Sequence, residues 1–383
     1  MNPAQTPRQG FDEFDLRMMR RALALAEGVL YRTSPNPRVG CVLVRDGRVL
    51  AEGATEEAGR RHAEIVALDA ARAHGIDPRG ATAYVSLEPC SHHGRTPPCA
   101  DALVAAGVAR VVAAARDPNP LVDGGGLQRL RAAGVDVACG LLENESRELN
   151  LGFFSRIERG RPWLRLKVAS SLDGVTALPN GASQWITGPA ARADAHHWRA
   201  RACAVLTGIG TVRDDDPSLN VRHVATTRQP WCVVVDSRLE LSPRARLLQH
   251  GRAQRVLVAH ALGDAEAAHR GAALLELGVG LLAIPAAPDK PGKVDLHALM
   301  HELAQRQIGE LHAEAGARLN ASLLGAGVVD ELLLYQAPLL LGQGAGIGPF
   351  GPLQQVDQGL RLHRVQVESI GVDFRWRARL AGG

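Results

Sequence analysis

The 383-residue sequence has few aromatic residues, little net charge and no long apolar run. Phe, Trp and Tyr make up 4% of the chain, which argues against a nucleic-acid surface on which bases stack against aromatic side chains. The net charge is only +4, and acidic and basic residues are mixed along the chain. No apolar segment reaches the length of a membrane span, and residues 1–10 lack the apolar centre of a signal peptide. We therefore expect a cytoplasmic protein that binds neither nucleic acid nor membranes.

Cysteine is also scarce, with six residues in the chain, as expected for a reducing compartment. Four of the cysteines lie in apolar, strand-like runs, where free cysteine usually behaves as a small buried hydrophobic residue. These four are Cys41, Cys139, Cys203 and Cys232. The other two, Cys90 and Cys99, are candidate metal ligands.

Together with His62, these two cysteines form a candidate zinc site. One imidazole and two thiolates can hold a Zn²⁺ ion and leave its fourth position for water. Glu64 lies two residues after His62, so it can stand beside the metal without binding it and transfer a proton to or from the water. A His-x-Glu motif combined with a Pro-Cys segment, here Pro89-Cys90, is the layout of the zinc deaminases.

The spacing of the two cysteines departs from the usual deaminase signature. Residues 91–98 separate them, whereas the signature has a Cys-x-x-Cys segment. Two other interpretations therefore stay open: two unrelated cysteines near a histidine at a helix start, or a closed structural zinc site with His92 or His93 as its fourth ligand. Glu64 favours the catalytic interpretation, because a structural site has no use for this carboxylate.

Local patterns in the first 140 residues predict a three-layer α/β/α domain. His62 and Cys99 each begin a predicted helix, so two positive helix N-termini would converge on the metal. The predicted elements are a hairpin over 39–53, strands over 82–87 and 108–114, and helices over 62–73, 99–106 and 127–133.

A second α/β domain with a mainly parallel sheet is predicted after a chain break at residues 159–162. Residues 141–158, just before the break, have the pattern of one charged helix. Beyond it, the predicted strands are 163–169, 204–207, 231–235, 255–259, 278–284, 310–313 and 331–335, and the predicted helices are 190–202, 294–307 and 317–324.

Glycines follow two of these strands, at residues 208–211 and 314–316. Their backbone amides could approach a phosphate, which suggests a nucleotide lying across the strand ends. The pair His196-His197 falls in a predicted helix, where we expect a solvated face.

Longer motifs resemble the bifunctional riboflavin-biosynthesis deaminase–reductases. The deaminase part of that family is matched by Pro35-Asn36-Pro37, His62-Ala63-Glu64, residues 87–99 and residues 117–120. The long segment between the cysteines is then the family's own variant of the signature. The reductase part, whose fold is similar to dihydrofolate reductase, is matched at residues 170–174, 183–187, 208–211, 215–219 and 314–316.

This resemblance implies a cytidine-deaminase-like α/β/α domain over residues 12–145, a helix and linker over 146–162, and a dihydrofolate-reductase-like domain over 163–383. It also implies two consecutive reactions on pyrimidine nucleotides. The first is zinc-dependent deamination of 2,5-diamino-6-ribosylamino-4(3H)-pyrimidinone 5′-phosphate. The second is NADPH-dependent reduction of the ribosyl group of 5-amino-6-(5-phosphoribosylamino)uracil to a ribityl chain.

The resemblance implies a role for each matching residue. His62, Cys90 and Cys99 would hold Zn²⁺, and Glu64 would be the catalytic acid/base. The deaminase substrate would contact Asn36, His92 and Arg95. NADPH would contact Ala169, Trp185, Thr211, Asp215, Ser237, Gly316, Ala317, Arg318, Leu319, Asn320, Ala321 and Ser322. The reductase substrate would contact Ser183, Arg199, Leu219, Arg222 and Glu314.

Two other functions stay open. A nucleic-acid base deaminase with an RNA-binding second half would share the zinc site, but it needs a basic stripe with interleaved aromatics. A non-catalytic zinc scaffold would tolerate the loss of Glu64. The family suggests a homo-oligomer. The chain departs from the family at Gly125, where a basic residue is common, and in the short stretch between Arg222 and Trp231.

Overall fold

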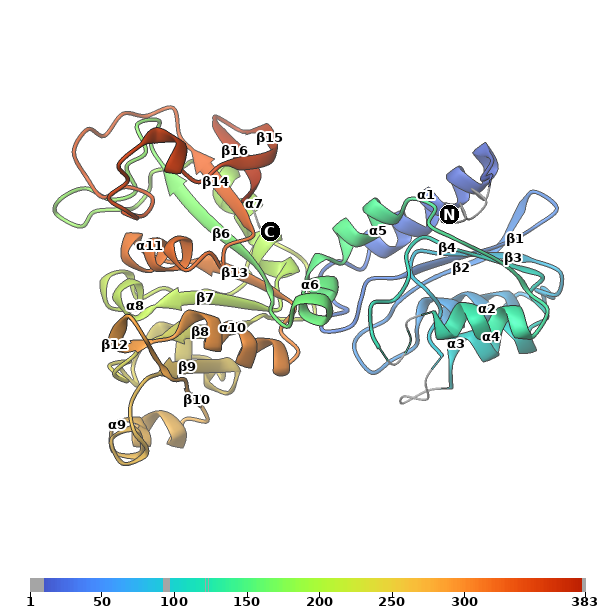
Figure 1. Ribbon diagram of the computed structural model, residues 1–383, viewed down its shortest axis with the longest axis horizontal. Helices are drawn as coiled ribbons and strands as arrows, with labels where there is room; N and C mark the ends of the chain where they lie inside the picture. The colour runs from blue at the N-terminus through green and yellow to red at the C-terminus, as the bar shows by residue number, and fades with distance from the viewer. Residues whose placement is uncertain (1–9, 92–96, 121, 123, 381–383) are drawn as a thin grey trace, which may run out of the picture. The chain divides into compact units, whose positions relative to one another are not determined.

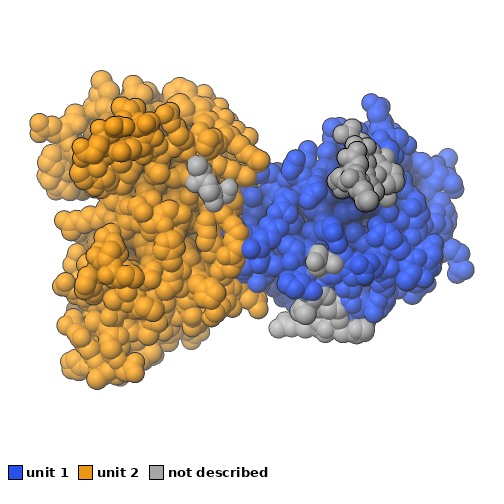
Figure 2. Space-filling model, in the orientation of Figure 1, with its two compact units in different colours: residues 1–158 blue, residues 159–383 orange. Residues whose placement is uncertain are grey.

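The protein is described by a computed structural model that covers residues 10–91, 97–120, 122 and 124–380. The chain divides into two compact units, residues 1–158 and 159–383 (Figure 2). The division lies at the beginning of the break predicted over residues 159–162. Among the described residues, no helix has both the length and the apolar character needed to cross a membrane.

The first unit is a five-stranded sheet with helices on both faces (Figure 1). The strand order is β2-β1-β3-β4-β5; β1 is antiparallel to β2 and β3, and β3, β4 and β5 are parallel. The predicted three-layer α/β/α architecture is confirmed. The elements are α1 (Glu13–Glu27), β1 (Gly40–Arg45), β2 (Arg48–Ala54), α2 (Ala63–Ala73), β3 (Thr82–Val85), α3 (Cys99–Ala105), β4 (Arg110–Ala113), α4 (Gly125–Ala132), β5 (Asp136–Cys139), α5 (Glu143–Leu149) and α6 (Leu151–Arg159).

Alternation along the strands gives this sheet two cores, because successive side chains of a strand point to opposite faces. Cys41 and Leu43 pack in one core with α2, α3 and α4. Val42 and Val44 pack in the other, with α1 and the N-terminal side of α5. Helix α1 is an element that the sequence patterns did not predict.

The segment 141–158 is two helices, α5 and α6, and the prediction of one helix was wrong. The interruption lies at Asn150, whose side chain is fully buried. Its Oδ1 accepts a hydrogen bond from the backbone N–H of Arg38 at 2.8 Å, and its Nδ2 donates to the Arg38 carbonyl at 3.0 Å. These bonds stabilise the break because they satisfy a backbone segment that comes from elsewhere in the unit.

The second unit contains a nine-stranded sheet of order β10-β9-β8-β7-β13-β6-β14-β16-β15 (Figure 1). The seven strands from β10 to β14 are parallel, and β16 and β15 are antiparallel, which confirms a mainly parallel sheet. The strands of this sheet are β6 (Trp163–Ser170), β7 (Ala204–Gly208), β8 (Trp231–Val235), β9 (Val256–His260), β10 (Gly280–Ala283), β13 (Glu310–Glu314), β14 (Glu331–Gln336), β15 (Leu362–Ile370) and β16 (Asp373–Leu380). A separate two-stranded sheet is formed by β11 (Ala286–Ala287) and β12 (Lys290–Val294).

Helices cover both faces of this sheet, and their buried faces complete three further apolar clusters. The carboxyl ends of the parallel strands meet at one edge, where open α/β sheets bind ligands.

The sequence patterns did not predict helices α8 and α9 or the hairpins β11–β12 and β15–β16. The helices are α7 (Pro189–Arg201), α8 (Ile209–Asp215), α9 (Asp264–Glu276), α10 (Leu296–Gln305) and α11 (Ala317–Gly325), with short 3₁₀ turns η1 (Arg246–Leu248), η2 (Ala253–Arg255) and η3 (Val356–Gln358).

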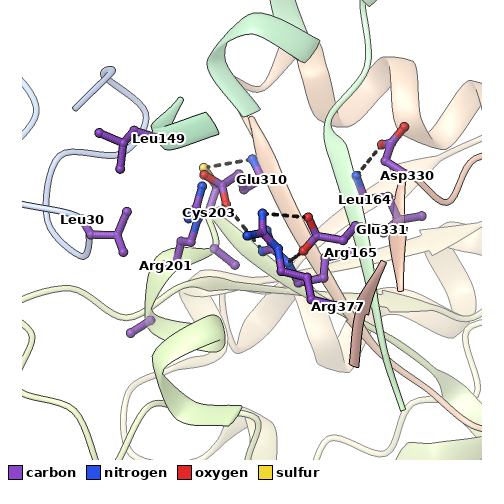
Figure 3. A network of polar contacts seen from close by, with 12 residues as sticks. Leu30, Leu149, Leu164, Arg165, Arg201, Cys203, Glu310, Asp330, Glu331 and Arg377 are labelled. Carbon is purple, nitrogen blue, oxygen red and sulfur yellow. Dashed lines mark hydrogen bonds and ion pairs between the residues drawn. The ribbon is translucent and has the colours of Figure 1, made fainter. Parts of the chain in front are cut away.

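A buried charge cluster links four neighbouring strands of the second unit (Figure 3). The guanidinium of Arg165 on β6 donates to Glu331 on β14, and Glu331 also accepts from Arg377 on β16 at 3.1 Å. On the other side of β6, Glu310 on β13 accepts from Arg201 at 2.7 Å. Burial by itself would raise the pKa of Glu331, but Arg165 and Arg377 lower it to about 2. Because an unpaired buried charge is costly, these pairs favour a single strand register.

Candidate active sites

The three predicted zinc ligands lie together in the first unit. His62 is the residue that precedes α2, Cys90 follows β3, and Cys99 is the first residue of α3. His62 Nδ1 lies 3.7 Å from Cys90 Sγ and 3.4 Å from Cys99 Sγ. All three ligand atoms lie within 4.8 Å of one another. Two helix N-termini therefore converge on one point, and their dipoles favour negative charge there.

The spacing of these atoms fits a tetrahedral zinc ion. Zn–S bonds of about 2.3 Å and Zn–N bonds of about 2.0 Å put a nitrogen and a sulfur ligand about 3.5 Å apart. The observed 3.4 and 3.7 Å between His62 Nδ1 and the two sulfurs lie on either side of this value. Among the described residues, the group consists of His62, Cys90 and Cys99. Catalytic zinc sites likewise have three protein ligands.

The three ligands shift one another's pKa. The hydrogen bond from Cys99 and the contact with His62 together lower the pKa of Cys90 to about 4, against the opposing effect of burial. Glu64 lies in the first turn of α2 and is only 3% exposed. Burial raises the pKa of Glu64 to about 7, and the negative charge of Cys90 contributes to the rise. The position of this carboxyl group, buried beside the three ligand atoms, suits a residue that transfers protons.

Glu88 is a residue of this site whose role the sequence did not reveal. Its buried carboxylate accepts four backbone hydrogen bonds of 3.0 to 3.2 Å. The donors are the N–H groups of Asp117, Gly124, Gly126 and Leu127. Glu88 therefore fixes the start of α4 to the strand end that carries Pro89 and Cys90. In the sequence, only the place of Glu88 directly before Pro89-Cys90 indicates that it belongs to this site.

Gly126 completes this contact, because a Cβ atom there would lie 1.9 Å from the carbonyl oxygen of Pro89. At Gly125, the departure from the family, a Cβ atom would lie 2.9 Å from the Ser91 hydroxyl. A side chain at Gly125 therefore fits only if the Ser91 hydroxyl moves.

The predicted contacts of the deaminase substrate are only partly visible. Asn36 lies before β1, half-buried, and its backbone N–H donates to the Thr33 carbonyl at 2.9 Å. His92 and Arg95 lie outside the described residues, and so does His93, the other candidate for a fourth ligand.

The second unit has a cleft of about 1900 Å³ at the carboxyl ends of β6, β7, β8 and β13. All the predicted reductase-substrate residues line this cleft, and so do all the predicted NADPH residues except Ala321. The first set is Ser183, Arg199, Leu219, Arg222 and Glu314; the second is Ala169, Trp185, Thr211, Asp215, Ser237, Gly316, Ala317, Arg318, Leu319, Asn320 and Ser322.

The two glycine-bearing segments lie side by side in this cleft. Gly208 precedes α8 and Gly316 precedes α11. The backbone N–H of Gly316 donates to Thr211 Oγ1 at 3.0 Å, and a Cβ atom on Gly208 would lie 3.1 Å from the Leu319 side chain. This close approach explains why the sequence has glycine at the end of β7.

Arg199 and Glu314 form a bidentate pair within the cleft. Arg199 Nε and Nη2 donate to the two Glu314 oxygens at 2.7 and 2.9 Å, and Nη1 donates to the Asn220 carbonyl at 2.6 Å. Burial by itself would raise the pKa of Glu314, but Arg199, His312 and Lys167 together hold it well below its usual range. The guanidinium of Arg199, one of the expected substrate contacts, is therefore hydrogen-bonded to protein groups.

Arg222 lies close to this pair and is exposed to the cleft. Its backbone N–H donates to His196 Nδ1 at 3.3 Å. His196 is buried and packs edge-to-face on His223, with ring centroids 4.7 Å apart. The expectation of a solvated His196 was wrong, because α7 turns this residue toward the segment that carries Arg222, whereas the next residue, His197, is exposed.

These two units define a zinc-dependent deaminase joined to an NADPH-dependent reductase. Residues 12–115 match the cytidine and deoxycytidylate deaminase zinc-binding region, and residues 162–375 match the RibD C-terminal domain. The chain belongs to the RibD family of bifunctional riboflavin biosynthesis enzymes.

Individual relatives match along nearly the whole chain. The riboflavin biosynthesis protein RibD of Escherichia coli K12 is 43% identical over 368 residues, which cover 93% of this chain and 96% of that protein. The Aquifex aeolicus protein of the same name is 40% identical over 362 residues, with 94% and 97% covered.

Two solved structures show the same architecture. Acinetobacter baumannii RibD, form 2, superposes with a TM-score of 0.86 at 42% identity, covering 96% of this chain and 99% of that chain. A Thermotoga maritima protein described as a diaminohydroxyphosphoribosylaminopyrimidine deaminase/5-amino-6-(5-phosphoribosylamino)uracil reductase has a TM-score of 0.83 at 33% identity, with the same coverage.

Proposed function

We propose that this chain catalyses both reactions that the family resemblance implies. The first unit hydrolyses the 2-amino group of 2,5-diamino-6-ribosylamino-4(3H)-pyrimidinone 5′-phosphate and releases ammonia. The second unit reduces the ribosyl group of the resulting 5-amino-6-(5-phosphoribosylamino)uracil to a ribityl chain with NADPH. The observation that carries the first step is the group of His62, Cys90 and Cys99 with the carboxylate of Glu64 buried beside it.

In the deaminase reaction, His62, Cys90 and Cys99 would hold Zn²⁺. When bound, the metal supplies a water molecule of lowered pKa. Glu64 would accept a proton from this water and donate one to the departing amino group. Glu88 would act as a positioning residue, because it fixes the segment that ends at Cys90. Asn36, His92 and Arg95 would contact the pyrimidine nucleotide.

In the reductase reaction, the protein would supply orientation and charge, because the nicotinamide carries the hydride. The backbone N–H groups in the first turn of α11 would bind the cofactor phosphates. The side chains of residues 316–322 and the ends of β6, β7 and β8 would contact the rest of NADPH. Ser183, Leu219, Arg222 and Glu314 would contact the substrate. Arg199 would hold the Glu314 carboxylate in place, an arrangement supported by the bidentate pair.

We also propose the extent of the parts and the state of the protein. The deaminase domain would span residues 12–145, the helix and linker 146–162, and the reductase domain 163–383. The chain would form a homo-oligomer in the cytoplasm and bind neither nucleic acid nor membranes. Support for an oligomer comes from β15, an edge strand exposed along nearly its whole length, since such edges pair readily with another chain. Light scattering of the purified protein tests this.

The proposed reactions are tested by mixing the zinc-loaded protein with the diaminopyrimidine substrate and NADPH under anaerobic conditions. Ammonia release should come first, and oxidation of NADPH should follow it. Without the pyrimidine, neither signal should appear. Ammonia release from single-stranded RNA or DNA, with none from the nucleotide, would favour the nucleic-acid deaminase instead.

A further inference from the structure

Two positively charged residues near the end of β8, Arg238 and Lys293, have none of the roles described above. The hairpin of β11 and β12 lies against this strand end, and the backbone N–H of Val294 donates to Ser237 Oγ at 3.2 Å. Arg238 is next to Ser237, and Lys293 is next to Val294. One hydrogen bond therefore brings together two positively charged residues that are far apart in the sequence.

Both cations are available to a ligand. Arg238 and Lys293 are exposed, and both line the cleft. In the part of the chain that the structure describes, neither forms an ion pair with a carboxylate. Two other cations that line the cleft do form ion pairs: Lys290 Nζ lies 3.7 Å from Asp289 Oδ2, and Arg213 Nη1 lies 3.2 Å from Glu240 Oε2.

Asp236, the acidic residue at the end of β8, is not placed to bind the ribose of a dinucleotide. In dinucleotide-binding folds, an acid near the end of the second strand binds the ribose hydroxyls of NAD, whereas an arginine there accommodates the 2′-phosphate of NADP. Here the acidic residue that directly follows β8 is Asp236, and it is only 1% exposed. Its Oδ2 accepts from the backbone N–H of Leu241 at 2.8 Å, within its own turn; Oδ1 is also buried and has no hydrogen-bond partner among the described residues.

The order of strands gives the direction of the cofactor. β13, which leads to the start of α11, is followed in the sheet by β7 and then β8. Strands lie about 4.8 Å apart, so the end of β8 is about 10 Å from the end of β13. A cofactor with its pyrophosphate at the start of α11 and its nicotinamide near Ala169 on β6 would extend its adenosine ribose toward Ser237.

We propose that Arg238 and Lys293 bind the 2′-phosphate on the adenosine ribose of NADPH and thereby select NADPH over NADH. Ser237 lies between them; its hydroxyl oxygen accepts from Val294, which leaves its O–H to donate to a phosphate oxygen. This inference rests on the proposed function, because it requires that the cleft binds the reduced cofactor.

Binding measurements on the full-length protein test this without turnover. Calorimetry with adenosine 2′,5′-bisphosphate and with ADP isolates the 2′-phosphate, and fluorescence titration with NADPH and NADH tests the whole cofactor. Arg238→Ala and Lys293→Ala should each raise the Kd for NADPH and for the 2′,5′-bisphosphate about tenfold, as expected for the loss of one charge-assisted hydrogen bond. The Kd values for NADH and ADP should stay unchanged.

A conservative variant and a matched control sharpen the result. Lys293→Arg should keep most of the NADPH affinity, because the positive charge remains. Arg244→Ala removes an exposed arginine from the same connection between β8 and β9, outside the residues that line the cleft, and should alter none of the four Kd values.

Two outcomes would overturn the proposal. If Arg238→Ala and Lys293→Ala weaken NADPH and NADH equally, or leave both unchanged, these residues do not bind the 2′-phosphate, and the proposed function still stands. If the unaltered protein binds neither dinucleotide, the proposed function of the cleft fails, and this inference fails with it.

Discussion

The Nδ1 atom of His62 lies 3.4 Å from the Sγ atom of Cys99, although 37 positions separate the two residues in the chain. The contact arises because α2 and α3 begin at the same edge of the first sheet, so that each helix presents its first residues to the other. Cys90, at the end of the strand between them, completes the group. Each ligand therefore depends on a different element, and removing one of them should affect metal binding more than the fold.

Cys99→Ser should lose zinc and deaminase activity together, because a serine hydroxyl is a much poorer zinc ligand than a thiolate. Metal analysis of the purified variant measures this directly. Cys139→Ser is the matched control, since Cys139 lies on β5 outside the ligand group, and it should keep its zinc. A full complement of zinc in Cys99→Ser would exclude this residue as a ligand.

Glu64→Gln should abolish ammonia release while zinc stays bound. The amide keeps the shape of the side chain but cannot accept a proton from water, and general acid/base groups typically contribute about 10²–10⁴-fold to the rate. Reduction of substrate that has already been deaminated serves as the internal control and should continue at the normal rate. Near-normal deamination by this variant would contradict the assignment.

Glu88→Gln should destabilise the first unit and reduce its zinc content. The amide would turn an N–H₂ group toward backbone N–H donors, and each buried donor left without a partner costs about 1–3 kcal/mol. With two donors affected, the free energy of unfolding should fall by about 2–6 kcal/mol, measured by urea unfolding. Glu143→Gln, an exposed glutamate in the first turn of α5, should change neither quantity. An unchanged unfolding midpoint for Glu88→Gln would show that the four hydrogen bonds are dispensable.

His196 should make the stability of the second unit depend on pH. Burial lowers the pKa of His196 to about 4, and Arg199 and Arg222 contribute to the shift. The unfolded chain, with a histidine pKa of about 6.5, binds more protons than the folded chain between these two values. The free energy of unfolding should therefore fall by up to about 3 kcal/mol as the pH falls from about 6.5 to about 4.

His196→Gln should remove this part of the pH dependence, because the amide oxygen can still accept from the Arg222 N–H but does not titrate. Urea unfolding of both proteins at pH 7 and pH 5 gives the comparison, and the difference between them cancels the groups that they share. Equal losses of stability in the two proteins would mean that His196 is protonated in the folded state.

The sequence predicted the zinc group and most of the parallel strands, because both depend on short-range patterns. His62, Glu64 and Cys99 lie at helix starts that hydrophobic periodicity and Pro98 mark locally. The predicted bounds of β6, β7 and β8 differ from the observed ones by at most one residue.

The features that the sequence did not predict depend on contacts between distant segments. Asn150 breaks a helical pattern because Arg38, far away in the chain, takes up its amide. Glu88 shows its role only once the start of α4 lies over it, and His196 looked solvated until the segment of Arg222 covered it. Such tertiary hydrogen bonds leave no periodic signal in the sequence.

Arg222→Ala tests the phosphate site of the reductase. Arg222 is an exposed residue that lines the cleft, and its Nη1 donates to Asn220 Oδ1 at 2.6 Å. The Arg199 guanidinium already forms a bidentate pair with Glu314. Of the two arginines, Arg222 is therefore the one that can turn toward a substrate phosphate.

A charge-assisted hydrogen bond to phosphate is worth roughly 1.5–3 kcal/mol, so the substrate KM of Arg222→Ala should rise about ten- to a hundredfold. The KM for NADPH and the rate of deamination should not change. Steady-state kinetics decide the matter: an unchanged substrate KM would make Arg222 an ordinary surface arginine, and a rise in the NADPH KM alone would assign it to the cofactor.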